Sequence, residues 1–441
     1  MGSRRYTVSS AYSFDAIVVG AGPAGSSAAL TMARAGLKVA LVERGTFPGE
    51  KNMFGGVLHR LPSLEEVFPD FWERAPLERH IVKKGVTFMT GDSTFSTTIE
   101  AGNFDRPPYN GYTIFRPRFD RWLAEEAVKA GATLITRATV DELVIRNGQV
   151  AGVTILDRRG ELTAPVVVAA DGVLSFTAKK AGLRQPTFDP GQMAVGVKAL
   201  IDMPREMIDD RFGLVRDQGF ANEFVGGTGG VRGGGFLYTN YDSLSIGLVF
   251  HLGSLRTSGK TPYDLLNAFM EQPQVDKMIR GGRLQEYSAH VIPEGGYAMI
   301  PELVGDGIIV AGDAAALCNA TGLNLEGINL ASHSGVLAGK AVIAAHQAGD
   351  FSRRGLQVYR QLMDDSYVIK DLKLYRKAPH MLHNDRIYNE YPELVCGMME
   401  YIYRIDGAPK ENLSKLFLKT AREKVGLKNL AADAFSAWRA L

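Results

Sequence analysis

Residues 14–44 read FDAIVVGAGPAGSSAALTMARAGLKVALVER, and this stretch decides the fold. The apolar run at 16–19 predicts a buried strand, the segment after it predicts a helix, and the run at 38–42 predicts a second strand. A glycine-rich turn joins the first strand to the helix. A strand, such a turn, a helix and a second strand in this order predict a Rossmann-type α/β unit.

The glycine-rich turn predicts a binding site for a pyrophosphate. Gly20 allows the tight turn after the strand, Gly22 lets backbone N–H groups approach phosphate, and Gly25 lets helix and strand pack closely. Pro23 and Ala24 open the helix, whose N-terminus carries partial positive charge. We therefore take all five residues as candidate dinucleotide-binding residues.

An acidic residue closes the second strand. Glu43 lies about 20 residues beyond the glycines, where a carboxylate can accept hydrogen bonds from ribose hydroxyls. Arg44 follows it and is counted with it as a cofactor-binding candidate. A turn that binds nothing is the alternative, but both strands, the helix and the acid are all in place. We therefore expect a bound dinucleotide.

Segments far downstream indicate which dinucleotide is bound. The sequence from 305 predicts a buried strand that delivers Gly312 and Asp313 to the start of a new helix. A carboxylate after a strand can hold a ribityl hydroxyl of a flavin. Glu326, Gly327 and Ile328 precede another helical pattern, and N–H groups exposed there can hold the pyrimidine edge of a flavin ring.

A third strand at 166–170 ends in the polar turn Asp171-Gly172, which completes a set of three motifs. Their order resembles the FAD-binding domain of glutathione-reductase-like flavoproteins. The branch in question contains hydroxybenzoate hydroxylase, geranylgeranyl reductases and electron-transfer-flavoprotein:quinone oxidoreductases. The resemblance implies that FAD, rather than NAD, is the cofactor, and it adds Asp171 and Gly172 to the candidate contacts.

The resemblance implies an α/β fold, with a glutathione-reductase-like FAD-binding Rossmann domain, an inserted antiparallel-sheet substrate domain and a helical C-terminal region. The expected ranges are 12–75, 112–185 and 290–350 for a discontinuous FAD-binding domain, 76–111 and 186–289 for the quinone or substrate domain, and 351–441 for helices that cap the fold or dock a partner. Glycines and aromatic residues are frequent in the second of these domains.

The middle FAD segment contributes two further candidates. A helical pattern begins at Arg116-Pro117, and Arg118 near its N-terminus can approach the cofactor or form a surface ion pair. Residues 139–168 predict a small antiparallel excursion, and Val140 at its start is counted as a cofactor contact.

A loop after the second strand narrows the family. Lys51 and Asn52 precede the paired glycines Gly55 and Gly56, and this segment resembles the loop that lies against the flavin in the FixC family. FixC proteins are the quinone-reducing FAD subunits of electron-bifurcating Fix (EtfABCX) complexes. The resemblance makes all four residues cofactor-binding candidates, and it extends over nearly the whole sequence.

Two residues are candidates for the chemistry. Lys51 can favour an anionic reduced flavin through its charge, and a solvated loop lysine is the alternative. Tyr238, in a glycine-rich strand, can donate a hydrogen bond to a quinone carbonyl, and a packed core tyrosine is the alternative. His251, His290 and His333 are candidate proton donors, and nothing in the sequence chooses among them.

The cysteine content points to partners. Cys318 and Cys396 cannot supply four thiolates for an iron–sulfur cluster, and we predict no metal site. In Fix complexes a separate ferredoxin-like subunit carries the cluster. The resemblance therefore implies four partners: the α and β subunits of an electron-transfer flavoprotein, a ferredoxin-like iron–sulfur subunit and a membrane quinone.

Charge and hydropathy limit the other classes. The 50 basic residues are offset by 48 acidic ones, so no nucleic-acid partner is predicted. No run approaches the roughly 20 apolar residues of a spanning helix, and the N-terminus lacks the apolar core of a secretion signal. We expect a cytoplasmic protein with peripheral contact to the cytoplasmic face of the membrane.

The expected activity is the transfer of electrons from an electron-transfer flavoprotein through FAD to a membrane quinone. A geranylgeranyl-reductase-like enzyme that saturates isoprenoid double bonds would share nearly every FAD motif. An aromatic hydroxylase would also need a nicotinamide cofactor and oxygen. A structural subunit that retains FAD without redox cycling is the non-enzymatic alternative.

Overall fold

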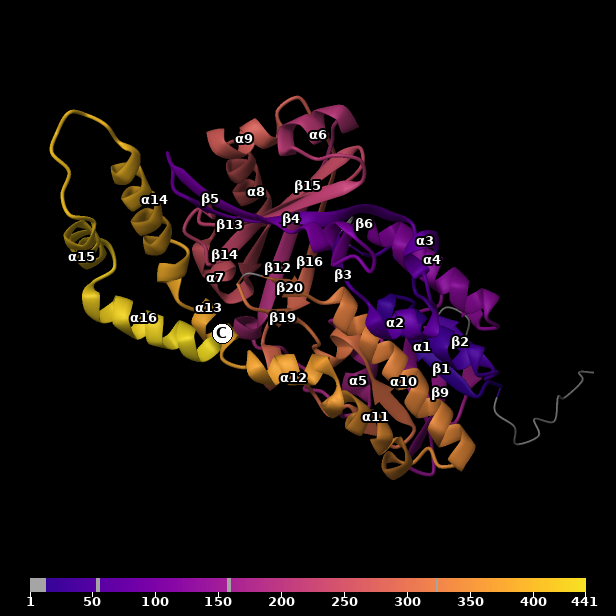
Figure 1. Ribbon diagram of the computed structural model, residues 1–441. Coiled ribbons are helices and arrows are strands. Elements are labelled where there is room, and N and C mark those ends of the chain that lie inside the picture. The colour runs from indigo at the N-terminus through magenta and orange to yellow at the C-terminus, as the bar shows by residue number, and fades with distance from the viewer. Residues whose placement is uncertain (1–12, 53–55, 157–159, 323) are drawn as a thin grey trace, which may run out of the picture.

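The computed structural model describes residues 13–441 except 53–55, 157–159 and 323. Two sheets organise these residues, and helices cover them (Figure 1). The smaller sheet has six strands in the order β17-β18-β11-β1-β2-β7. Its strands are β1 (Ala16–Val19), β2 (Val39–Val42), β7 (Thr133–Ile135), β11 (Val167–Ala169), β17 (Val304–Gly305) and β18 (Ile308–Val310).

The smaller sheet is the predicted Rossmann unit. β1 pairs in parallel with β2 on one side and with β11 on the other, and every residue of these three strands is buried. Helices on both faces of a parallel sheet explain why its strands are continuous apolar runs. Helix α1 (Pro23–Arg34) is the crossover between β1 and β2. The predicted fold class is confirmed.

Helix α10 (Ile328–Ala348) packs closely against α1. Gly335 permits this approach, because a Cβ atom there would lie 2.0 Å from the carbonyl oxygen of Ala24. The hydroxyls of Ser27 and Ser332 form a buried hydrogen bond of 2.7 Å between the two helices. The N-terminal ends of α1 and α10 are thus held in a fixed relation.

The larger sheet has the order β16-β12-β15-β14-β13-β4-β6-β3, with β5 paired to β4. Its strands are β3 (Gly56–His59), β4 (Leu77–Met89), β5 (Thr94–Glu100), β6 (Gly111–Ile114), β12 (Met193–Asp202), β13 (Gln218–Val225), β14 (Gly233–Thr239), β15 (Ser243–His251) and β16 (Arg283–Pro293). All pairs are antiparallel except β13 with β4. These two strands are distant in sequence, so a long crossover can bring them together in parallel.

Shorter elements complete these layers. Helices α6 (Arg205–Phe212), α8 (Pro262–Met270) and α9 (Pro273–Ile279) contribute apolar side chains to the core on one face of the larger sheet. The remaining helices of the first 350 residues are α2 (Pro62–Val67), α3 (Phe71–Arg74), α4 (Arg116–Lys129), α5 (Phe176–Lys180) and α7 (Leu252–Ser258). A three-stranded antiparallel sheet of β8 (Val140–Arg146), β9 (Gln149–Ile155) and β10 (Gly160–Thr163) forms the excursion expected at 139–168.

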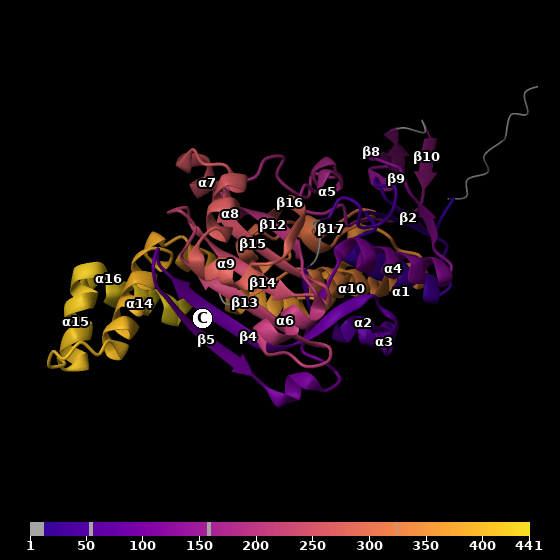
Figure 2. The ribbon, with the colours of Figure 1, turned by 90° about the horizontal axis from the view of Figure 1, so that it is seen from above.

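The C-terminal region is helical, as expected. Its helices are α11 (Arg353–Asp365), α12 (Tyr367–Leu374), α13 (Ala378–Leu382), α14 (Glu390–Tyr403), α15 (Leu413–Lys424) and α16 (Leu427–Ala440). Figure 2 shows α14, α15 and α16 at one end of the molecule and β8, β9 and β10 at the other. No helix within the described part of the chain is long and apolar enough to cross a membrane.

The proposed domain ranges stay a prediction. One detail bears on them: β3 and β6 pair with each other and belong to the larger sheet, although most of both strands falls in ranges that we assigned to the FAD-binding domain. The chain therefore passes between the two sheets several times.

Candidate functional site

A cavity of about 1370 Å³ lies where the two sheets meet. It gathers residues from segments that are far apart in sequence. Of the predicted site residues, its wall contains Gly20, Gly22, Pro23, Ala24, Glu43, Arg44, Lys51, Asn52, Gly56, Val140, Asp171, Gly172, Tyr238, Asp313, Glu326, Gly327 and Ile328. Most of the predicted site residues thus line one cavity.

Three described candidates lie outside this lining, and a fourth has no described position. Gly55 is outside the described residues. Gly25 lies behind the wall, where a Cβ atom would come within 1.8 Å of the carbonyl oxygen of Gly20, which fits the predicted role in helix–strand packing. Gly312, also behind the wall, has a φ of +66°, and its N–H donates to the hydroxyl of Ser334.

Arg118 corrects an expectation. Its side chain is 63% exposed and lies 3.4 Å from the carboxylate of Glu78, which is the ion-pair alternative. Arg116 lines the cavity instead and is held by two hydrogen bonds of 2.8 Å to Asp120. Positions two apart on a helix face in nearly opposite directions, so only one of these arginines can face the cavity.

The pyrophosphate end of the cavity is built by the first turn of α1. Gly20 has a φ of +97°, and a Cβ atom there would lie 2.4 Å from the carbonyl oxygen of Ala170. Gly22 has no atom within 4 Å of a Cβ position, so open space lies directly beside its backbone. This space and the unpaired N–H groups of a helix N-terminus suit a phosphate.

Glu43 is positioned for a ribose. Its carboxylate accepts hydrogen bonds from the N–H of Ala21 at 3.1 Å and of Gly45 at 2.7 Å. Each oxygen is thereby oriented but keeps further acceptor capacity toward the cavity. The backbone bonds explain how one acid at the end of β2 is held beside the glycine turn.

Asp171 leaves an acceptor for a ligand. Its Oδ2 atom accepts from the N–H of Thr177 at 2.9 Å, while its Oδ1 atom is buried and has no hydrogen-bond partner among the described residues. Burial raises the pKa of this carboxyl. A buried acceptor without a partner is costly, and a ligand hydroxyl in the cavity would satisfy it.

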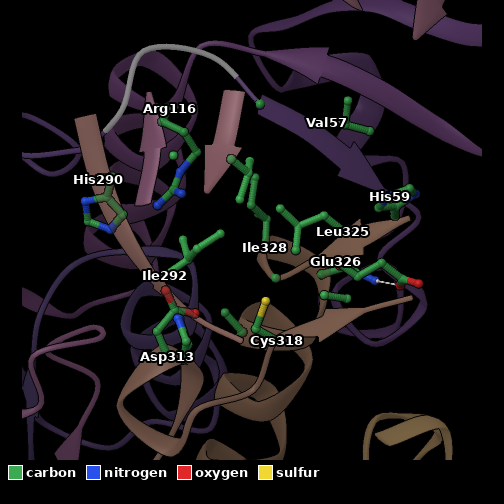
Figure 3. A pocket seen from close by; sticks show the side chains of 18 of the residues that line it. Val57, His59, Arg116, His290, Ile292, Asp313, Cys318, Leu325, Glu326 and Ile328 are labelled. Carbon is green, nitrogen blue, oxygen red and sulfur yellow. Dashed lines mark hydrogen bonds between the residues drawn. The ribbon is translucent and has the colours of Figure 1, made fainter. Parts of the chain in front are cut away.

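Asp313 and the start of α10 line the cavity beside the first turn of α1, since a Cβ atom at Gly312 would lie 2.8 Å from that of Ala24 and 3.5 Å from that of Ala331. Figure 3 shows Asp313, Cys318, Arg116 and His290 arranged around one space, with Ile328 entering it from α10. Burial raises the pKa of Asp313, and the positive charges of Arg116 and Arg184 oppose this rise. Charged groups therefore meet here in a cavity whose wall contains both apolar and polar side chains.

Comparisons with known proteins agree with this geometry. Residues 13–214 match the FAD-binding domain family, and residues 378–441 match the C-terminal domain of the ETF-QO/FixC family. Protein FixC of Escherichia coli K12 is 44% identical over 422 residues, which are 95% of this chain and 97% of that protein. FixC of Bradyrhizobium diazoefficiens is 40% identical over 435 residues, or 97% of this chain and 99% of that protein. The chain belongs to the FixC family.

Membership of the FixC family confirms FAD as the cofactor and makes the chain an FAD-dependent oxidoreductase. A further relative at 42% identity over 429 residues, 97% of this chain and 99% of its own length, is the probable electron transfer flavoprotein-quinone oxidoreductase YdiS of E. coli K12.

Solved structures share the fold. A geranylgeranyl bacteriochlorophyll reductase-like protein of Thermoplasma acidophilum has a TM-score of 0.72 at 20% identity, covering 95% of this chain and 99% of its own. The flavin-dependent brominase Bmp2 has a TM-score of 0.60 at 16% identity, covering 93% and 98%. At these identities the likeness concerns architecture alone.

We expect the residues along this FixC-family cavity to hold FAD in the following way. Gly22 and the first turn of α1 would hold the pyrophosphate, and Glu43 would hold a ribose. Asp313 and the N-terminus of α10 at Gly327 would hold the ribityl chain and the ring. FAD supplies the redox chemistry, and these residues supply binding and orientation.

A buried lysine in the cavity wall was missed by the sequence analysis. Lys198 on β12 donates a hydrogen bond of 2.8 Å to the hydroxyl of Tyr238, and both side chains line the cavity. Burial lowers the pKa of Lys198 to about 7, with the charge of Arg116 acting in the same direction. Tyr238 also stacks on Phe236 at 5.5 Å between ring centroids.

The other functional candidates differ in whether they line the cavity. Lys51 lines the cavity, but its side chain is largely exposed and lies 3.4 Å from Glu50, so its effect on the flavin stays a prediction. His251 and His290 line the cavity. His333 is absent from its lining, and its Nδ1 atom bonds to the hydroxyl of Ser63 at 2.8 Å.

Proposed function

We propose that this chain accepts electrons from an electron-transfer flavoprotein and passes them through FAD to a membrane quinone, within an electron-bifurcating Fix-type complex. The observation that carries this proposal is the match over nearly the full chain to FixC proteins and to a probable electron transfer flavoprotein-quinone oxidoreductase. The C-terminal match to the ETF-QO/FixC family supports the same activity.

The wall beyond the proposed ring end suits a flat, lipophilic acceptor. Phe236, Leu237 and Ile292 contribute apolar surface to it. Lys198 and Tyr238 place N–H and O–H groups in these apolar surroundings, where they can donate hydrogen bonds to a carbonyl oxygen. An apolar cavity with a few convergent donors is typical of a small-molecule site.

The two cysteines favour an iron–sulfur cluster that is bound by another subunit. Cys318 and Cys396 are buried, unpaired thiols. A cluster for the transfer pathway would therefore reside on a ferredoxin-like partner subunit, beside the α and β subunits of the electron-transfer flavoprotein.

The C-terminal helices offer a surface for peripheral contact with a membrane. Trp438 and Phe435 on α16 are 79% and 55% exposed, and Tyr403 at the end of α14 is 76% exposed. The ring of Phe435 lies under the guanidinium of Arg439 at 5.5 Å. Exposed aromatic and basic side chains together favour the headgroup region of a bilayer, on the cytoplasmic face in this proposal.

Stopped-flow reoxidation tests the proposal. The purified FAD-loaded protein is reduced and then mixed with a short-chain ubiquinone or menaquinone analogue without oxygen. We expect quinone-dependent reoxidation of the flavin. Tyr238→Phe keeps the ring stack and removes the acceptor of Lys198, so it should slow the reaction without changing FAD content.

Tyr287→Phe is the matched control, because Tyr287 lies on β16 outside the cavity lining and packs on Tyr263. It should react as the unaltered protein does. Reduction of an isoprenoid alkene together with inertness toward quinones would instead support the geranylgeranyl-reductase alternative. A flavin that cycles with neither acceptor would indicate a structural FAD subunit.

A further inference from the structure

A second cavity opens on the far side of one buried histidine. This surface cavity of about 470 Å³ is lined by Arg232, His383 and Asp385, among others. His251 lines both this surface cavity and the large interior cavity. The side chain of His251 is only 5% exposed, so it forms a thin partition between the surface and the interior.

On the interior side, His251 faces a buried acid. The Nδ1 atom of His251 lies 3.5 Å from the Oε2 atom of Glu294, whose side chain is 10% exposed. Neither atom has a hydrogen-bond partner within the described part of the chain. Two orphaned polar atoms that face one another across this distance are one small movement, or one water, from a hydrogen bond.

Glu294 leads into the site already described. It follows β16, and His290 and Ile292 near the end of that strand line the interior cavity beside Asp313 (Figure 3). Glu294 itself lines the same cavity. An acid at this place can reach a ligand in the interior, while His251 separates it from the surface.

The second ring nitrogen faces Tyr388, which lines the interior cavity but not the surface cavity. The Nε2 atom of His251 lies 3.5 Å from the hydroxyl of Tyr388, which donates to the carbonyl oxygen of Leu382 at 2.9 Å. The ring of His383 packs edge-on against that of His251, with 5.1 Å between centroids. His251 thus has one nitrogen toward Glu294 and the other toward Tyr388, while its ring packs on His383, which lines the surface cavity.

We propose that His251 and Glu294 form a proton relay that carries protons from the surface cavity to a quinone in the interior cavity. The relay rests on the proposed quinone reduction. It adds a defined entry route for protons, which the family match does not specify. Glu294 is the terminal donor, and His251 is the connecting group.

The proton balance of the reaction requires such a donor. Conversion of a quinone to a quinol turns two C=O groups into two C–OH groups and takes two electrons and two protons. Bound FAD, once reduced, would supply both electrons and one of the protons. The second proton leaves the Glu294 carboxyl for a quinone oxygen. The resulting carboxylate regains a proton from Nδ1 of His251, and a proton that enters from the surface cavity, which His251 lines, replaces it on the imidazole.

The electrostatics of the two groups fit these roles. Burial raises the pKa of Glu294 to about 7, so the acid can be protonated near neutral pH. Burial lowers the pKa of His251 to about 4, with His383 and Arg232 acting in the same direction and Asp385 opposing them. A neutral imidazole can accept on one nitrogen while it donates from the other.

The kinetic test compares Glu294→Gln with the unaltered FAD-loaded protein in quinone-dependent reoxidation. For the unaltered protein the rate should fall as pH rises through about 7, because Glu294 loses its proton. Glu294→Gln should react at least about tenfold more slowly below that pH and lose this pH dependence. Glu294→Asp keeps an acid and should recover part of the rate.

Chemical rescue tests the connecting group. His251→Ala should slow reoxidation, and added imidazole, which can enter from the surface cavity, should restore it. His333→Ala is the matched control: His333 is a half-buried histidine whose pKa is also lowered to about 4, mainly by burial, but it lines neither cavity. Its rate should be unaltered and insensitive to imidazole.

Infrared spectroscopy supplies a readout without turnover. The oxidised protein below pH 7 should show a carboxylic-acid C=O band that shifts in D₂O, and Glu294→Gln should lack it. FAD content and thermal unfolding identify any misfolded variant. Unchanged kinetics and an unchanged band in a folded Glu294→Gln protein would reject the relay alone. If the unaltered protein does not reduce quinones, the proposed function and the relay fail together.

Discussion

Replacing Gly22 with valine separates cofactor binding from folding. The backbone at Gly22 has φ −76° and ψ −172°, which any residue can adopt, and nothing lies within 4 Å of a Cβ atom there. The apo protein should therefore fold with unchanged stability. The new side chain would occupy the space that we assign to the pyrophosphate and would keep it from the N–H groups of the turn.

The expected loss follows from the bonds that this displacement removes. A hydrogen bond to a charged group contributes about 1.5–3 kcal/mol, so losing two of them costs roughly 3–6 kcal/mol. This corresponds to a weakening of FAD binding by about 10² to 10⁴-fold. Gly22→Ala should show a smaller loss, because one methyl group displaces the phosphate less.

Glu43→Ala and Gly25→Val serve as comparisons. Removing Glu43 deletes hydrogen bonds to ribose hydroxyls, worth about 1–3 kcal/mol together, so FAD binding should weaken less than in Gly22→Val. Gly25→Val should fail to fold even without FAD, because its Cβ atom would lie 1.8 Å from the carbonyl oxygen of Gly20. Isothermal titration with FAD and thermal unfolding of the apo proteins measure these effects. A folded Gly22→Val protein that binds FAD normally would refute the assignment.

Three further outcomes are expected. The apo protein should gain stability between about pH 7 and pH 10, because the unfolded chain binds the Lys198 proton more tightly over this range. The gain in the free energy of unfolding is at most about 4 kcal/mol, and Lys198→Met should flatten it. Chemical denaturation at several pH values measures both effects. Arg79→Met should destabilise the larger sheet by about 3–5 kcal/mol in the same assay, since Arg79 is fully buried and its loss leaves Asp209 and several carbonyl oxygens without their donor. The purified chain should contain flavin and negligible iron by elemental analysis, and its two buried thiols, Cys318 and Cys396, whose pKa values are raised chiefly by burial, should resist alkylation until the protein unfolds.

The parts of the site that depend on local backbone chemistry could be predicted from the sequence. Gly20 and Gly25 allow a turn and a close contact that few other residues permit, and Glu43 follows the strand that comes after the helix begun by this turn. These requirements act over a few tens of residues. A single sequence therefore carries them, and the six-stranded sheet follows from the apolar runs between them.

The parts that depend on packing between distant strands could not be predicted. Lys198 stands in an apolar strand. It is recognised as a site residue only because β14 brings Tyr238 to it across β15. The choice between Arg116 and Arg118 depends on the rotation of one helix about its axis. His251 and His333 look equivalent as sequence, and only the course of β15 and α10 places the first at a cavity and the second against Ser63.

The close contact between α1 and α10 fixes the distance between the N-terminal ends of these two helices. The first turns of both helices line the FAD cavity, and at Gly335 a Cβ atom would lie 2.0 Å from the carbonyl oxygen of Ala24. The spacing of the two N-termini is consequently a property of the apoprotein and does not wait for the cofactor. A bulky residue at Gly335 would push the helices apart and displace both N-termini at once.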